Sequence, residues 1–340
     1  MSDDVRQIRG AIRGSAESAA SSHFCVGGVS VRVTGNDRST VALVPSLIPF
    51  RARREVSDVN IRIERVSKLS PKPGLQLFDS GALWRLYECE FGFQFDFSAP
   101  VFGDQPYKRL IVDRDFSCAT LQVSEEVFAA FPYAAPLDYP LDELLIMHRL
   151  TQEKAIELHS CGIVGPDGVG NLFVGHSGAG KSTTTRLWTA RADAEVLSDD
   201  RIIVRREADQ QHAEQQHKAH RLRENCASRT SRSAQDDKKK YMMRMYGTPW
   251  HGEAMYASPG NAPLARIFIL EHGSGNVLTP LSPSQAVAEL FARAFVPFHR
   301  HEYVESALEF LQEVADAVPC YRYAFEPNQS AVERILEFRD

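Results

Sequence analysis

Short alternating apolar runs fill the first part of the chain. Gly, Pro, Asp and Asn separate them, which is the pattern of β-strands joined by turns. The expected strands cover residues 29–33, 40–44, 59–66, 75–78, 83–97, 109–112 and 119–123. Phe91, Phe93, Phe95 and Phe97 would share one face of a pleated strand, and we expect that face to be core. This part is predicted to be a mostly antiparallel β module.

Two helical patterns and a proline-rich link follow. Apolar residues recur at helical spacing over 124–131 and 141–152, with the link at 132–140 between them. Exposed, Pro-rich segments commonly mark domain boundaries. The predicted division is a flexible segment at 1–23, a β-rich accessory domain at 24–135 and a second domain at 136–340.

The second half alternates apolar strands with amphipathic helices, as α/β domains do. Expected strands include 169–174, 202–204, 265–271 and 320–325, and expected helices are 181–192, 282–295, 302–318 and 330–338. A polar stretch at about 207–240, rich in Gln, His, Arg, Ser and Lys, interrupts this order. It cannot bury enough apolar surface to offset its ordering entropy, so it is predicted to be a disordered insertion. His148 and the His-Arg-His turn at 299–301 are expected at the surface.

Composition is that of an ordinary globular protein. The 340 residues are 43% hydrophobic and carry a formal net charge of −5, which gives no electrostatic reason to expect nucleic acid or an anionic membrane as a partner. No apolar run approaches the roughly 20 residues that span a bilayer, and the N-terminus has no secretory pattern. The 6 cysteines are scattered without a CxxC pair. We therefore expect reduced thiols and a cytoplasmic location.

The strongest motif is Gly, four residues, then Gly-Lys-Ser at 175–182. It follows an apolar strand and precedes a helix, as in phosphate-binding P-loops, whose backbone N–H groups point at phosphate oxygens. The lysine adds charge for the β- and γ-phosphates, and the serine hydroxyl binds Mg²⁺. The residues expected to bind the nucleotide are Gly175, His176, Ser177, Gly178, Ala179, Gly180, Lys181, Ser182 and Thr183. The motif predicts ATP and Mg²⁺ as cofactors.

An acidic pair lies about 17 residues beyond the P-loop. Asp199 and Asp200 stand between apolar stretches, an arrangement that brings a carboxylate to the metal ion beside the P-loop serine. A later stretch, 244–253, combines turn-forming residues with Arg244, Trp250, His251 and Glu253, which favours a site loop over a connector. The base-reading motif of GTPases and the signature motif of ABC ATPases are both absent.

Together these features resemble the HPr kinase/phosphorylase superfamily, relatives of ATP-dependent phosphoenolpyruvate carboxykinase. The likeness rests on Leu158-His159, the P-loop and Leu197-Ser198-Asp199-Asp200-Arg201, and it covers roughly residues 140–335. It is nearest to HPr kinase-like proteins encoded beside peptide-modification clusters. The resemblance implies an α/β P-loop kinase domain with a mixed sheet, preceded by the β-rich accessory domain. Members often form homo-oligomers, so self-association is an open alternative.

The resemblance also implies roles for single residues. Lys181 and the P-loop would hold the phosphates, Ser182 and Asp200 the metal, and Asp199 would be the general base. His159 would lie near metal and phosphate, and the two aspartates could exchange roles. The second family signature, a Glu-Ile-Arg-Gly-like stretch, is absent here. We expect Glu253 to replace its metal-side carboxylate and Arg244 to serve as the charge-stabilising arginine.

These departures argue against HPr as the substrate and against reverse phosphorolysis. The resemblance favours ATP-dependent phosphoryl transfer to a hydroxyl, serine above others, of a protein or peptide. Two alternatives stay open: a small-molecule kinase on the same scaffold, and a nucleotide-sensing ATPase without transfer to a partner.

Overall fold

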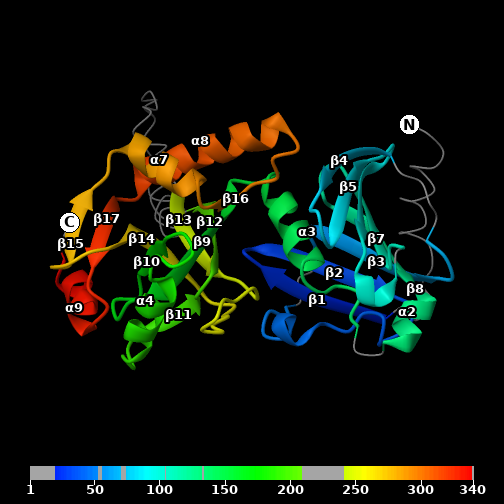
Figure 1. The fold of residues 1–340 in the computed structure, drawn as a ribbon, viewed down its shortest axis with the longest axis horizontal. Helices are drawn as coiled ribbons and strands as arrows, with labels where there is room; N and C mark the ends of the chain where they lie inside the picture. The colour runs from blue at the N-terminus through cyan, green and yellow to red at the C-terminus, as the bar shows by residue number, and fades with distance from the viewer. Residues whose placement is uncertain are drawn as a thin grey trace, which may run out of the picture. The chain divides into compact units, whose positions relative to one another are not determined.

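The computed structural model describes residues 20–52, 56–69, 74–103, 105–131, 134–208 and 241–338. The chain divides into two compact units, drawn in Figure 1. The first unit comprises residues 1–152 with 297–301, and the second comprises 153–296 with 302–340. The helix after the Pro-rich link therefore lies in the first unit, whereas the sequence predicted that the second domain begins at residue 136.

A mixed eight-stranded sheet forms the first unit. Its order is β1-β2-β3-β8-β7-β6-β5-β4. The neighbours β2–β3 and β3–β8 run parallel, and the other neighbours run antiparallel. The strands are β1 (Ala20–Val26), β2 (Val29–Gly35), β3 (Val59–Val66), β4 (Leu75–Asp79), β5 (Trp84–Glu88), β6 (Gly92–Phe97), β7 (Lys108–Asp113) and β8 (Cys118–Ser124).

Three local predictions for this sheet are wrong. Ala20 begins strand β1, so the flexible segment does not extend to residue 23. The expected strand at 83–97 is two strands, because Cys89 and Gly92 exchange backbone hydrogen bonds in a turn. Residues 40–44 form no strand, since the Asp37 carboxylate accepts from the Thr40 N–H at 2.8 Å and closes a turn there. The prediction that the alternating phenylalanines form a core face is confirmed in β6, where Phe93, Phe95 and Phe97 are each 1% exposed.

In the described residues of this unit, the α-helices are α2 (Glu125–Ala130) and α3 (Leu141–Leu150). The expectation that His148 lies at the surface of α3 is wrong. Its ring is buried against Phe95, Phe116 and His299 at centroid distances of 5.1, 4.9 and 5.2 Å. Burial is the main cause that lowers the pKa of His148 to about 3, and the charge of His299 adds to it. Burial likewise lowers the pKa of His299 to about 4.

A second mixed sheet of nine strands organises the second unit. Its main path is β10-β9-β12-β13-β14-β17-β15, while β11 and β16 also pair with β9. Because β10 pairs with β14 as well as β9, five of these strands close into a ring. The strands are β9 (Ala155–Val164), β10 (Gly170–Val174), β11 (Glu195–Ser198), β12 (Arg201–Ala208), β13 (Tyr241–Gly247), β14 (Asn261–His272), β15 (Val277–Pro280), β16 (Ala294–Phe295) and β17 (Cys320–Phe325).

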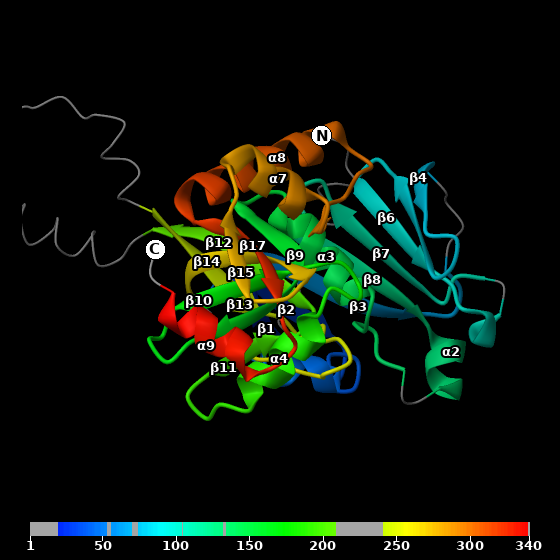
Figure 2. The ribbon, with the colours of Figure 1, turned by 60° about the vertical axis from the view of Figure 1, so that its left-hand side comes forward.

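Helices cover both sides of this sheet. In Figures 1 and 2, α7 (Pro283–Phe291) and α8 (His301–Ala317) lie on one side, and α4 (Lys181–Thr189) and α9 (Gln329–Glu337) lie on the other. Strand β10 is buried on both faces, as parallel-sheet strands usually are. Leu172 and Val174 join the core under α7 and α8, whereas Phe173 joins the core under α4 and α9. The strand that leads into the P-loop is thus fixed from both sides.

The predicted insertion at 207–240 lies outside the described residues from residue 209 onward. Glu207 and Ala208, which the sequence assigned to it, are instead the last residues of β12.

Within the described ranges, no helix has the length and apolarity to cross a membrane.

Candidate functional site

The P-loop joins β10 to α4. Gly180 is the residue before the helix and has φ +103°, a left-handed conformation that L side chains rarely adopt. A Cβ there would also lie 2.5 Å from Cζ of Phe325. Both facts require glycine at this position, where the chain turns from the loop into the helix N-terminus.

Lys181, the first residue of α4, is folded over the loop. It is 7% exposed, and its Nζ donates to the carbonyls of Gly175 at 2.9 Å and His176 at 3.2 Å. Burial is the largest cause of its lowered pKa, and the charges of Arg201 and Arg293 lower it further. The ammonium group is therefore already held where a P-loop lysine meets phosphate oxygens.

A break between two strands presents the acidic pair. Strands β11 and β12 pair one after the other with β9, so that Ser198 lies opposite Gly162 and Arg201 opposite His159. Asp199 and Asp200 occupy the interruption. The Ser198 hydroxyl accepts from the N–H groups of Asp200 at 3.3 Å and Arg201 at 3.2 Å. Irregularities of this kind re-aim side chains, and here they turn both aspartates out of the ladder.

Asp199 holds a neighbouring loop. Its carboxylate is 2% exposed and accepts from the backbone N–H groups of Gly252 at 3.0 Å, Ala254 at 2.8 Å and Tyr256 at 3.2 Å. A Cβ on Gly252 would lie 3.0 Å from Oδ2 of Asp199 and 3.1 Å from Cβ of Asp200, so glycine permits this approach. Three of about four lone-pair directions of the Asp199 carboxylate are therefore committed to the loop.

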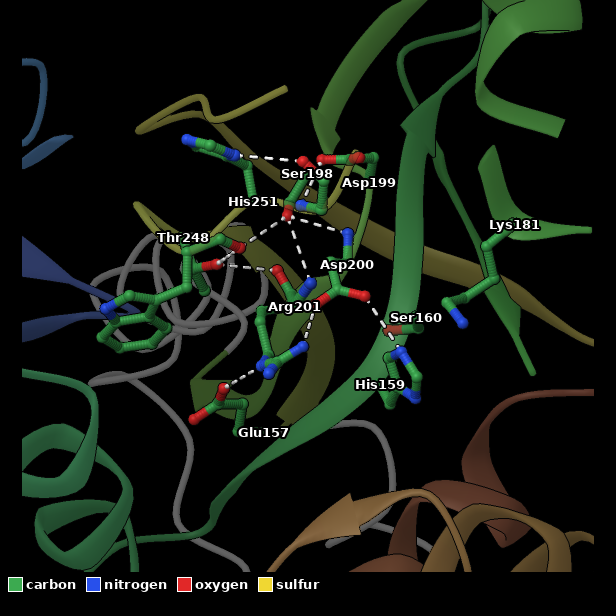
Figure 3. Close-up of polar contacts among 12 residues, drawn as sticks. Glu157, His159, Ser160, Lys181, Ser198, Asp199, Asp200, Arg201, Thr248 and His251 are labelled. Atoms are coloured by element: carbon green, nitrogen blue, oxygen red, sulfur yellow. Dashed lines mark hydrogen bonds and ion pairs between the residues drawn. The ribbon is translucent and has the colours of Figure 1, made fainter. Parts of the chain in front are cut away.

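Asp200 lies between a histidine and an arginine, as Figure 3 shows. Its Oδ1 is 2.9 Å from Nε2 of His159, and its Oδ2 accepts from Nη1 of Arg201. Burial, followed by the charges of Lys181, Arg201 and Arg293, lowers the pKa of His159 to about 4. The neutral tautomer that fits this contact donates Nε2–H to Oδ1 of Asp200. This tautomer leaves a lone pair on Nδ1.

A cavity of about 380 Å³ joins these parts. Its lining contains His159, Ser177, Gly178, Gly180, Lys181, Ser182, Thr183, Asp199, Asp200, Gly252 and Glu253. The P-loop, the acidic pair and the loop held by Asp199 therefore face one space.

Most predicted residues lie at this cavity or in the P-loop backbone beside it, but Arg244 does not. It is on β13, where its Nη1 is 2.6 Å from Oδ1 of Asn261 and its Nε is 3.4 Å from Oε2 of Glu207. The described residues thus give Arg244 an ion pair instead of a place at the cavity. The arginine beside the acidic pair is Arg201.

The sequence assigned no individual role to Ser198, Arg201, Glu157 and Gly252, although Gly252 belongs to the predicted site loop at 244–253. Ser198 and Arg201 flank the acidic pair directly, which was a usable signal. Glu157 stands two residues before His159, so strand alternation puts both on one face. The closeness of Gly252 to the acidic pair left no local signal.

The donors at the cavity fit Mg²⁺. The Ser182 hydroxyl and the Asp200 carboxylate both line it, and Mg²⁺ prefers such oxygen ligands. In the part of the chain that the structure describes, no three His, Cys, Asp or Glu side chains cluster to hold a metal on their own. Mg²⁺ sites at phosphates use one or two carboxylates together with water and substrate oxygens.

Residues 171–245 match the family model of the AAA domain. The match begins in β10 and contains the P-loop, α4 and the acidic pair, so this region is a P-loop NTPase-like domain. It covers less than half of the chain. A search of curated proteins found no significant match.

Proposed function

We propose that this protein is an ATP-dependent kinase that transfers the γ-phosphoryl group to a hydroxyl of a protein or peptide, with serine as the favoured acceptor. The observation that carries the proposal is the shared cavity of Lys181, Ser182, His159 and Asp200. A phosphate-binding loop alone supports nucleotide binding. The Asp200 carboxylate and the His159 ring beside the loop would in addition supply a proton acceptor for the hydroxyl that receives the phosphoryl group.

The P-loop backbone and Lys181 bind the phosphates. The free N–H groups at the start of α4 would face the bound phosphates, and the helix dipole would add to this attraction. Ser182 and Asp200 would hold Mg²⁺, which neutralises phosphate charge when it is bound. Because transfer passes through a loose transition state, positioning and charge supply most of the rate.

We assign proton acceptance to the His159–Asp200 pair. In this proposal His159 donates Nε2–H to Asp200, and its Nδ1 lone pair takes the proton of the acceptor hydroxyl. The Asp200 carboxylate stabilises the imidazolium that forms, which offsets the burial that lowers the pKa of His159. The alternative that the sequence favoured, Asp199 as base, is less well supported because its carboxylate accepts three backbone N–H groups. Asp199 instead fixes the loop that carries Glu253 to the rim of the cavity.

A nucleotide-sensing ATPase is the second candidate, because the AAA domain match is compatible with hydrolysis without transfer. Incubation of the purified protein with γ-labelled ATP, Mg²⁺ and a cell lysate or candidate peptides separates the candidates. Label on serine of a protein or peptide supports the proposal. Label on a metabolite would favour a small-molecule kinase, and release of free phosphate alone would favour the ATPase.

A further inference from the structure

Four side chains of the second unit share one face of its sheet beside the cavity. Glu157 and His159 are two residues apart on β9, so they point to the same side. The strand register pairs Arg201 of β12 with His159 and Phe295 of β16 with Glu157. Neighbouring strands thus bring the four side chains together although they lie far apart in the chain.

The guanidinium of Arg201 is held on three sides. Its Nε is 3.5 Å from Oε1 of Glu157, its Nη1 donates to Oδ2 of Asp200, and its Cζ lies 4.3 Å from the centroid of the Phe295 ring. Figure 3 shows the contacts running from Glu157 through Arg201 and Asp200 to His159. Arg201 therefore links the buried carboxylate of Glu157 to the carboxylate of Asp200 at the cavity.

Glu157 is fully buried, with 0% exposure. Burial of a carboxylate costs several kcal/mol unless a charge partner or hydrogen bonds compensate it. Arg201 is such a partner, and the fork shape of a guanidinium lets it meet two carboxylates from a fixed position. A surface residue could not fix Arg201 as firmly, because exposed ion pairs are weak and flexible.

We propose that Glu157 and Arg201 are positioning residues for phosphoryl transfer, which fix the Asp200 carboxylate at the cavity. This inference rests on the proposed kinase function. Arg201 holds one oxygen of Asp200 while His159 holds the other, so the carboxylate is restricted to a single orientation. Glu157 acts on Asp200 through Arg201. Neither residue lines the cavity, so neither is assigned a contact with the nucleotide.

The test is a double-mutant cycle with Arg201→Gln, Glu157→Gln and the double variant. For each protein, kcat and KM for transfer, Mg²⁺–ATP affinity by calorimetry and the thermal midpoint are measured. Misplacement of a reacting group by about 1 Å costs about 10²-fold, so Arg201→Gln is expected to lower kcat by that factor. Glu157→Gln should lower kcat about 10-fold, and the double variant should be no slower than Arg201→Gln. ATP affinity should change by less than about threefold, since the P-loop is intact.

Arg206→Gln is the matched control. Arg206 lies on the same strand and pairs with Glu313 of α8 at 2.8 Å. Its loss removes an ion pair from β12 but should leave kcat unchanged.

Three outcomes would overturn the inference: an unchanged kcat in Arg201→Gln, multiplying losses in the double variant, or a loss of ATP affinity as large as the loss of kcat. These outcomes concern only the variants, so they would overturn the positioning role while the proposed kinase function of the wild-type protein still stands. If the wild type itself transfers no phosphoryl group, the proposed function and this inference both fail.

Discussion

Each unit contains a carboxylate–guanidinium contact and a histidine with a lowered pKa, but in different surroundings. In the first unit, Asp96 and Arg109 form two hydrogen bonds of 2.6 Å within the sheet, and His148 packs among aromatic rings. In the second unit, Arg201 contacts Asp200, and both Asp200 and His159 line a cavity.

A lowered histidine pKa occurs both at the candidate site and at a structural contact. Burial lowers the pKa of both histidines, so a perturbed pKa alone does not mark chemistry. His148 bonds a backbone carbonyl of its own helix, Leu144, at 2.6 Å. His159 bonds a carboxylate that faces open space beside a phosphate-binding loop. His159 thus differs from His148 in having a cavity, a carboxylate partner and a phosphate-binding loop beside it.

Asp200→Asn should give the largest effect. It removes the charge that meets the metal and orients His159, so transfer should fall about 10²–10⁴-fold, with the fold and the thermal midpoint retained. The measurement is the initial rate with saturating γ-labelled ATP. Asp193→Asn, which breaks an exposed pair with Arg191, is the control and should transfer at the wild-type rate. Undiminished transfer by Asp200→Asn would show that Asp200 has no role in phosphoryl transfer.

Arg109→Met tests whether the Asp96–Arg109 pair of the first unit is structural. It leaves Asp96 buried without its guanidinium, so the free energy of unfolding should fall by about 3–5 kcal/mol in urea titrations. Replacing both members, Asp96→Leu with Arg109→Met, should recover part of this loss. ATP affinity, measured where the protein is folded, should stay unchanged. A large loss of ATP affinity at undiminished stability would show that the first unit's pair is functional.

Acid should destabilise the first unit through His148 and His299. Their folded-state pKa values lie below the ordinary 6.5, so the unfolded chain binds more protons between pH 6.5 and the folded values of about 3 and 4. Stability is fully present above pH 6.5 and falls as pH drops through this window. His148→Phe should reduce the fall between pH 6.5 and 4 by about 2–3 kcal/mol, measured by urea unfolding at several pH values. An identical pH dependence in wild type and variant would contradict this.

Gly252→Ala should give the smallest effect. The added Cβ presses on Asp199 and Asp200 at about 3 Å and must shift the loop slightly. We expect kcat to fall about 10-fold with little change in the thermal midpoint. Ala254→Gly is the control, since Ala254 contacts Asp199 through its backbone N–H, which glycine keeps. An effect of the control as large as that of Gly252→Ala would argue against the close approach as the cause.

The parts of the site that depend on local rules could be predicted from the sequence. The P-loop needs glycine, lysine and serine at fixed spacing because one turn of backbone builds it. The acidic pair could be placed because it interrupts apolar strands soon after the P-loop. The alternating aromatic residues of β6 likewise identified a core face.

The remaining features depend on strand register, which no local pattern reveals. Arg201 and Glu157 meet because β12 and β9 pair at one particular offset. Arg244 contacts Asn261 and Glu207 and is not in the cavity lining. The local pattern did not show which strand its side chain would meet. His148 was wrongly expected at the surface because a histidine on a helix can be exposed or can pack in a core, depending on its partner.

The most direct test is isothermal titration calorimetry of the purified protein with ATP and Mg²⁺, which measures whether the P-loop binds the nucleotide. We expect saturable binding at one site per chain, and we expect Lys181→Ala to abolish it. Lys154→Ala, which removes a lysine that pairs with Glu313 at 3.0 Å, should leave binding unchanged. Absence of binding heat at millimolar ATP, or equal affinity in Lys181→Ala, would contradict the claim that this P-loop holds the phosphoryl donor.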